Sequence, residues 1–110
     1  MNHLTVPVIS VSSLSELLKD NSTAIQLIDV REAHERDICH IGGVHIPLGA
    51  LQENLQHIDT QQPVIIYCRS GGRSLYACRQ LIEAGYTDVT NVEGGILSWI
   101  QEIDPSLQAY

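Results

Sequence analysis

Cys68 lies in a short segment whose residue types favour thiol chemistry. The segment Cys68-Arg69-Ser70-Gly71-Gly72-Arg73 separates an apolar run at 64–67 from a helical pattern that follows it. A thiol attacks as its thiolate, and an unperturbed cysteine with a pKa of about 8.5 is only about 3% ionised at pH 7. Hydrogen-bond donors or positive charge around the sulfur would raise that fraction. We therefore predict that Cys68 is the reactive centre of the protein.

The backbone after Cys68 is suited to hold an anion. Ser70, Gly71 and Gly72 allow the chain to curl, because glycine adopts the positive φ angles that other residues resist. Successive N–H groups can then point inward and form an anion-binding nest. A helix expected from Ser74 adds its N-terminal partial charge, and Ser74 is expected to cap it and to turn its hydroxyl toward the sulfur. No histidine base lies nearby in the sequence.

The positive charges of the chain gather around this loop. The net charge is −7, with 13 acidic and 6 basic residues, yet Arg69, Arg73 and Arg79 fall within eleven residues of one another. The acidic balance argues against nucleic acid or an anionic membrane as a partner. We expect Arg69 and Arg73 to bind an anionic substrate. The alternatives are chance clustering on a solvated helix, a buried core thiol at Cys68, and a plain strand-to-helix turn.

The cysteines and the N-terminal sequence predict a cytoplasmic protein without a metal. Three cysteines (Cys39, Cys68 and Cys78) leave one over and form no CxxC pair, and the histidines have no metal spacing. Free thiols indicate a reducing compartment. Residues 1–7 contain no basic residue and no apolar run typical of a signal peptide, and no stretch approaches the about 20 apolar residues of a membrane span.

The order of elements predicts one α/β domain over residues 1–110. Apolar runs indicate about five short strands, at 8–9, 24–30, 44–46, 64–67 and 89–92. Helical patterns lie between and after these strands. The first begins with a capping-box spacing at 13–16, and the others lie at 50–57, at 74–84 and after Gly94-Gly95. Alternating strands and helices favour a mostly parallel central sheet with helices on both faces. Ligands bind such sheets beyond the carboxyl ends of the strands, where Cys68 falls.

Several segments in order resemble the single-domain rhodanese family of sulfurtransferases. The matching segments cover nearly the whole chain and are Asp29-Val30-Arg31-Glu32, Glu35 with His40-Ile41-Gly42-Gly43, Ile46-Pro47, Tyr67 to Ser74, and Val92-Glu93-Gly94-Gly95-Ile96 with Trp99. Two departures affect local packing more than activity: Cys39 replaces a usual Gly, and Gly43 a usual Ala. The six-membered loop matches the sulfurtransferases, whereas related phosphatases and arsenate reductases have seven members.

The resemblance implies a thiosulfate sulfurtransferase without a cofactor. In that reaction Cys68 takes the sulfane sulfur of thiosulfate, or of a related anionic donor, as a persulfide. The sulfur then passes to cyanide, a thiol or a protein. Alternatives are a persulfide carrier for cofactor or tRNA sulfur metabolism, an interaction module, and, with less support, a phosphatase or arsenate reductase. Asp29 and Arg31 are expected to pair at a strand end, with Arg31 a candidate for substrate contact.

Overall fold

A computed structural model describes residues 5–20, 22 and 24–110. Residues 1–4, part of the segment on which the expectation of no signal peptide rests, lie outside the described residues, as do residues 21 and 23. Among the residues that are described, no helix combines the length and the apolar character needed to cross a membrane.

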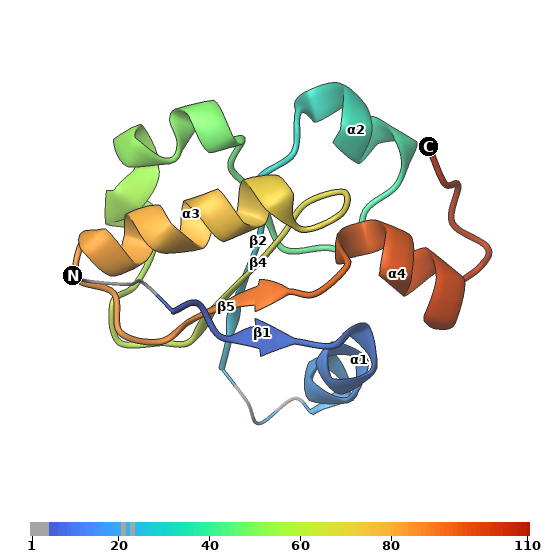
Figure 1. The fold of residues 1–110 in the computed structure, drawn as a ribbon, viewed down its shortest axis with the longest axis horizontal. Helices are drawn as coiled ribbons and strands as arrows, with labels where there is room; N and C mark the ends of the chain where they lie inside the picture. Colours follow the sequence, from blue (N-terminus) through green and yellow to red (C-terminus); the bar gives the residue numbers. More distant parts are fainter. Residues whose placement is uncertain (1–4, 21, 23) are drawn as a thin grey trace.

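Within the described residues, five short strands form one sheet, and every strand pair in it is parallel. The order across the sheet is β1-β5-β4-β2-β3, and Figure 1 labels the first four of these strands. The strands are β1 (Val8–Ile9), β2 (Gln26–Asp29), β3 (Val44–His45), β4 (Val64–Tyr67) and β5 (Val89–Val92). All four residues of the central strand β4 are buried, as a continuous apolar run predicts for a strand covered on both faces. The predicted parallel sheet is confirmed, with β2 and β3 shorter than expected.

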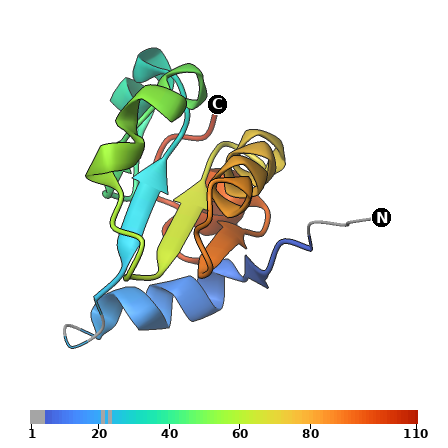
Figure 2. The same ribbon diagram turned by 90° about the vertical axis from the view of Figure 1, so that its left-hand side faces the viewer.

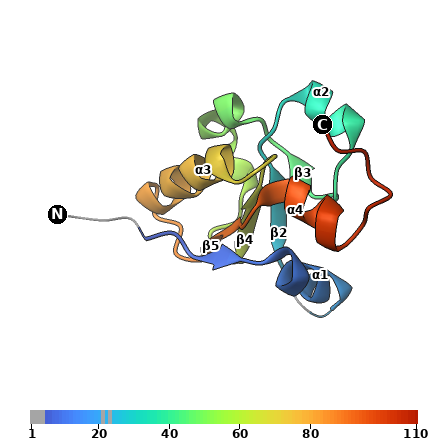
Figure 3. The same cartoon turned by 45° about the vertical axis from the view of Figure 1, so that its right-hand side comes forward.

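Helices cover both faces of the sheet, as predicted. The α-helices are α1 (Val11–Lys19), α2 (Ala33–Ile38), α3 (Gly72–Glu83) and α4 (Gly95–Glu102). On one face, α3 and the segment after β3 enclose a core with Ile28, Ile66 and Leu81, while α1 and α4 close a second core with Ile65 and Ile96. Figure 2 and Figure 3 show α3 and α1 on opposite sides of the strands.

Outside the Cys68 loop, three helical segments differ from the predictions. The helix expected at 50–57 is instead two 3₁₀ helices, η1 (Leu48–Ala50) and η2 (Gln52–His57). The first helix begins earlier than the capping-box spacing indicated, because the Ser10 hydroxyl accepts the Ser13 N–H and makes Ser10 the N-cap. Helix α2 was not predicted from periodicity; a six-residue helix shows too few turns, although Glu32 and Glu35 form a capping box there.

The carboxyl ends of β2 and β4 lie side by side. Asp29 ends β2 and pairs in register with Tyr67, which ends β4 and directly precedes Cys68. Helix α2 and the segment at 104–110 come together over this edge (Figure 1). The sheet therefore places Cys68 where parallel α/β folds bind ligands.

Candidate functional site around Cys68

The sulfur of Cys68 is buried within its loop and surrounded by hydrogen-bond donors. The residue is 1% exposed. Its Sγ accepts the N–H of Gly71 at 3.1 Å and that of Ser74 at 3.4 Å, and lies 3.3 Å from the Ser74 hydroxyl. Burial alone would raise the pKa of Cys68, but these hydrogen bonds outweigh it and hold the pKa below its ordinary value. A plain core thiol would lack these donors, so the environment is that of a stabilised thiolate.

The loop owes its shape to two glycines in the left-handed region. Gly71, at φ +114°, is the N-cap of α3 and turns its own N–H toward the sulfur. Gly95, at φ +61°, lets α4 approach the loop so closely that a Cβ there would lie 2.5 Å from the Arg69 carbonyl oxygen. The N–H groups of Ile96 and Leu97 then bind the carbonyl oxygens of Cys68 and Arg69. The N-termini of two helices, α3 and α4, thereby donate hydrogen bonds to the loop.

Ser74 does not cap α3, contrary to the prediction, because the helix already begins at Gly72. The Ser74 side chain is fully buried and donates to Asn91 Oδ1 at 2.5 Å, while Asn91 Nδ2 donates to the Gly71 carbonyl oxygen. The hydroxyl does face the Cys68 sulfur, as predicted. A hydroxyl has one proton, so Asn91 and a Cys68 thiolate compete for it, and the backbone N–H groups are the permanent donors to the sulfur.

Replacement of Ser74 by alanine should raise the pKa of Cys68 while keeping the backbone donors. A hydrogen bond to a charged group contributes about 1.5–3 kcal/mol, and sharing with Asn91 places this one at the lower end. The reaction rate of Cys68 with iodoacetamide should fall about ten-fold at pH values where the thiol is mostly protonated. Above both pKa values the two proteins should react alike. A rate-against-pH curve that does not move would contradict this account.

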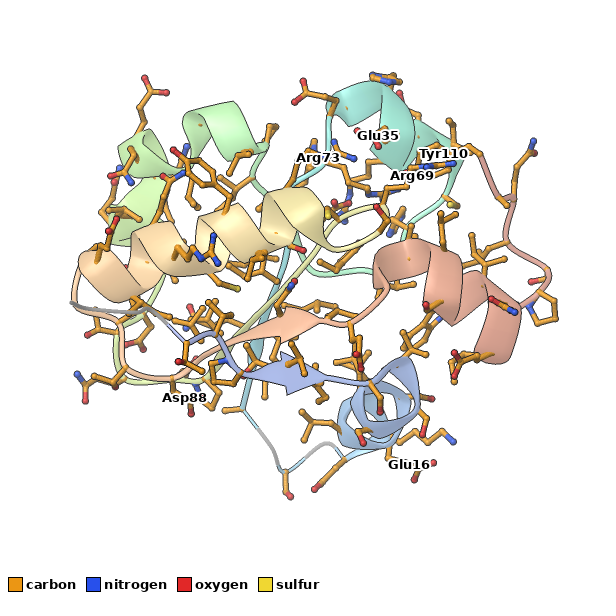
Figure 4. All side chains as sticks on the ribbon, viewed as in Figure 1. Glu16, Glu35, Arg69, Arg73, Asp88 and Tyr110 are labelled. Atoms are coloured by element: carbon orange, nitrogen blue, oxygen red, sulfur yellow. The ribbon has the colours of Figure 1, made fainter. Side chains whose placement is uncertain are left out.

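Arg73 lies at the rim of the loop in a bidentate ion pair with Glu35. Its Nη1 and Nη2 lie 2.6 and 2.9 Å from the two carboxylate oxygens of Glu35, a residue of α2 (Figure 4). The hydrogen bonds from Arg73 lower the pKa of Glu35 to about 2, and Glu35 in turn raises the pKa of Arg73. Glu35 was noticed in the sequence only as part of a family motif. Its charge offsets much of the positive charge that Arg73 brings to the loop.

Arg69 turns toward Tyr110. Its guanidinium lies over the Tyr110 ring, 5.1 Å from the centroid, and two of its nitrogens donate to the Tyr110 main-chain oxygen. Figure 4 shows Arg69, Tyr110 and Glu35 together above the loop, between α2 and the C-terminal segment. Nothing in the sequence pattern pointed to Tyr110.

Arg31 and Asp29 form a buried pair beneath the site. Both are fully buried, and Arg31 Nε and Nη2 donate to the two carboxylate oxygens of Asp29 at 2.9 and 2.8 Å. Burial would raise the pKa of Asp29, but the hydrogen bonds and charge of Arg31 outweigh it and lower the pKa. The remaining guanidinium bonds of Arg31 reach the Glu35 and Cys39 carbonyl oxygens and the Tyr110 hydroxyl. The expected strand-end pair is present, and contact of Arg31 with substrate stays a prediction.

The other two thiols have surroundings unlike those of Cys68. Cys39 packs in the core on the opposite face of the sheet from the core that includes Cys68. Cys78 shares the Cys68 core, but burial, with the negative charge of Cys68, raises its pKa to about 12. Within the described part of the chain, no group of three or more His, Cys, Asp or Glu side chains could hold a metal ion.

Comparison with known proteins agrees with this geometry. Residues 10–102 match the family model of the rhodanese-like domain. The putative sulfurtransferase YtwF of Bacillus subtilis is 38% identical over 98 residues, covering 88% of this chain and 93% of YtwF. The putative sulfur carrier protein YrkF of the same organism is 33% identical over 99 residues, covering 89% of this chain and 53% of YrkF.

Among solved structures, a rhodanese-related protein from Thermoplasma volcanium superposes with a TM-score of 0.78 at 32% identity. The match covers 88% of this chain and 93% of that one. The chain spans about a quarter to a half of the length of some curated relatives that it matches. A family match over most of the chain, joined to the fold and to the loop around Cys68, leads to one conclusion: this chain belongs to the rhodanese-like domain family.

Proposed function

We propose that this chain is a sulfurtransferase that carries sulfane sulfur on Cys68 as a persulfide. The observation that supports the proposal most is the Cys68 sulfur itself, which accepts N–H groups from its own loop at 3.1 and 3.4 Å and has a lowered pKa. Relatives named as a putative sulfurtransferase and a putative sulfur carrier support the same class of chemistry.

The first half-reaction loads the sulfur. The Cys68 thiolate attacks the outer sulfur of thiosulfate, a new S–S bond forms, the S–S bond of thiosulfate breaks, and sulfite leaves with the electron pair. The loop N–H groups that hold the thiolate would then stabilise the charge on the terminal sulfur of the persulfide. Ser70, Gly71 and Gly72 act here through the backbone. Arg69 attracts the anionic donor, and so does Arg73, although Glu35 offsets much of its charge.

The second half-reaction transfers the terminal sulfur of the Cys68 persulfide to an acceptor. An acceptor such as cyanide or a thiolate attacks the terminal sulfur, the persulfide S–S bond breaks, and Cys68 returns as a thiolate. Cyanide leaves as thiocyanate, and a thiolate leaves as a new persulfide. Each step is balanced without an external oxidant, because a neutral sulfur atom moves and the electron pair of the broken S–S bond stays with the leaving group. The reaction therefore needs no cofactor.

The second candidate function is that of a persulfide carrier whose sulfur acceptor is a protein. The name of YrkF, a putative sulfur carrier, favours it. The rate of turnover with thiosulfate and cyanide, compared with the rate of sulfur transfer to a protein thiol, distinguishes the enzyme from the carrier. An interaction module without activity would not need a thiol with a lowered pKa. The six-membered loop disfavours a phosphatase or an arsenate reductase. Hydrolysis of a phosphoester by the protein would be the observation that supports this alternative.

The test is the intact mass of the reduced protein after incubation with thiosulfate, beside a Cys68→Ala variant. The variant keeps Cys39 and Cys78, which are its matched control thiols. We expect the wild type to gain the mass of one sulfur atom and the variant none. A folded wild type whose Cys68 is alkylated by iodoacetamide but gains no sulfur would rule out thiosulfate as the donor.

A further inference from the structure

Tyr110 contacts Arg31 and Arg69 directly and is joined to Arg73 through Glu35. Its hydroxyl donates to Glu35 Oε2 at 2.9 Å and accepts Arg31 Nη1 at 2.8 Å, and its ring lies beside the Arg69 guanidinium. Glu35 in turn holds Arg73. One side chain at residue 110 therefore joins groups from the ends of β2 and β4, from α2 and from the start of α3 (Figure 4).

These contacts determine where the positive charges at the loop are held. Arg69 is a long side chain with several rotatable bonds, and ordering such a side chain has an entropic cost. The Tyr110 ring and main-chain oxygen hold its guanidinium in one place, while the Tyr110 hydroxyl holds Glu35 toward Arg73. A charge that is already in place attracts an anion more strongly than one that must first be ordered.

The segment that carries Tyr110 is itself attached to the core. Leu107 and Tyr110 pack against the core beneath α4, and a turn with Asp104 as acceptor of the Ser106 N–H leads into the segment. The permanent donors to the Cys68 sulfur are the backbone N–H groups of Gly71 and Ser74, which belong to the loop and the start of α3. Loss of the Tyr110 side chain should therefore disturb the rim charges and spare the sulfur.

We propose that Tyr110 is a positioning residue that orients Arg69 and the Glu35–Arg73 pair for anionic substrates of Cys68. The inference builds on the proposed sulfurtransferase function and specifies how the site selects its substrate class. Tyr110 touches no reacting atom. It acts through the arginines, so its loss should weaken reaction with anions and leave neutral reagents unaffected.

The experiment compares iodoacetate, an anion, with iodoacetamide, its neutral analogue, and follows alkylation of the Cys68 peptide by mass spectrometry. In Tyr110→Ala we expect the ratio of the iodoacetate rate to the iodoacetamide rate to fall about five-fold, with the iodoacetamide rate changed less than about two-fold. Tyr110→Phe keeps the ring beside Arg69 and should show a smaller fall. Tyr76→Ala, which removes a tyrosine 57% exposed on α3, should leave the ratio unchanged.

An unchanged or increased ratio in folded Tyr110→Ala would overturn the proposal, as would a parallel change in both rates, which indicates a disturbed loop. If Tyr110→Ala does not fold, Tyr110→Phe decides by the same ratio, and an unchanged ratio there overturns the proposal. In sulfur transfer, KM for thiosulfate should rise with little change in kcat. The alkylation ratio can be measured without any sulfur transfer. A failure of the proposed sulfurtransferase function can therefore be distinguished from a failure of the Tyr110 proposal.

Discussion

Cys68→Ser should reduce sulfur transfer at least about 10⁴-fold, a loss typical of removal of the nucleophile from an enzyme. Serine keeps the shape of the side chain and its access to the N–H groups of Gly71 and Ser74. Its hydroxyl, however, does not ionise at neutral pH, and its oxygen cannot carry the transferable sulfur of a persulfide. The measurement is the rate of thiocyanate formation from thiosulfate and cyanide, with the thermal unfolding of both proteins recorded.

Cys78→Ser is the matched control for this substitution. Cys78 is also fully buried on the same core face, but burial raises its pKa to about 12, so its thiol stays protonated. We expect this variant to keep its transfer rate within a few-fold and to lose stability instead, because moving a polar hydroxyl into this apolar core costs free energy. A folded Cys68→Ser protein that still transfers sulfur would contradict the assignment of Cys68.

Arg31→Met should lower the free energy of unfolding by about 3 kcal/mol, because it leaves the carboxylate of Asp29 buried without its main partner. Both side chains are fully buried. The loss should lie at the lower end of the range for broken buried pairs, since Arg36 Nη1 stays 3.3 Å from Asp29 Oδ2. Urea unfolding at pH 7 followed by circular dichroism measures the difference.

The pH dependence of that loss has a definite sign. Arg31 lowers the pKa of Asp29 in the folded state, so the pair contributes its stability above the ordinary pKa of the carboxyl and loses it as pH falls through the lowered one. The gap between wild type and Arg31→Met should therefore be larger at pH 7 than at pH 3, which lies below the ordinary carboxyl pKa of 3.8. Lys19→Met breaks an ion pair whose side chains are 70% and 76% exposed and should change stability by less than about 0.5 kcal/mol. An equally small loss in Arg31→Met would contradict the account.

The reactive loop and the strands around it could be predicted because their signals are local. Val64–Tyr67 is a continuous apolar run and became the central strand with its predicted bounds. The Ser-Gly-Gly sequence after Cys68 predicted a curled backbone, and Gly71 adopts φ +114° there. Alternation of strands and helices was sufficient to predict a parallel sheet, which in turn placed Cys68 at its carboxyl edge.

Short or irregular elements were predicted less well. The apolar positions at 50–57 suited a helix, but the chain forms two 3₁₀ helices, whose backbone hydrogen bonds are not visible in a hydrophobic pattern. Ser74 resembled a cap because it follows the loop, yet the glycines before it allowed α3 to start two residues earlier. Boundaries of this kind depend on backbone geometry more than on side-chain type.

By itself, the sequence determined the fold class, the family resemblance and the identity of the thiol that stands at a helix N-terminus. Only the tertiary structure decided which groups surround that thiol. Asn91 shares the Ser74 proton from 17 residues away, Glu35 binds Arg73 across 38 residues, and Tyr110 reaches Arg31 across 79. Residues this far apart meet only when the assembled sheet brings together the helices, loops and C-terminal segment around its carboxyl edge. Local periodicity contains no record of such contacts, and for that reason the charge arrangement at the loop appeared only in the folded chain.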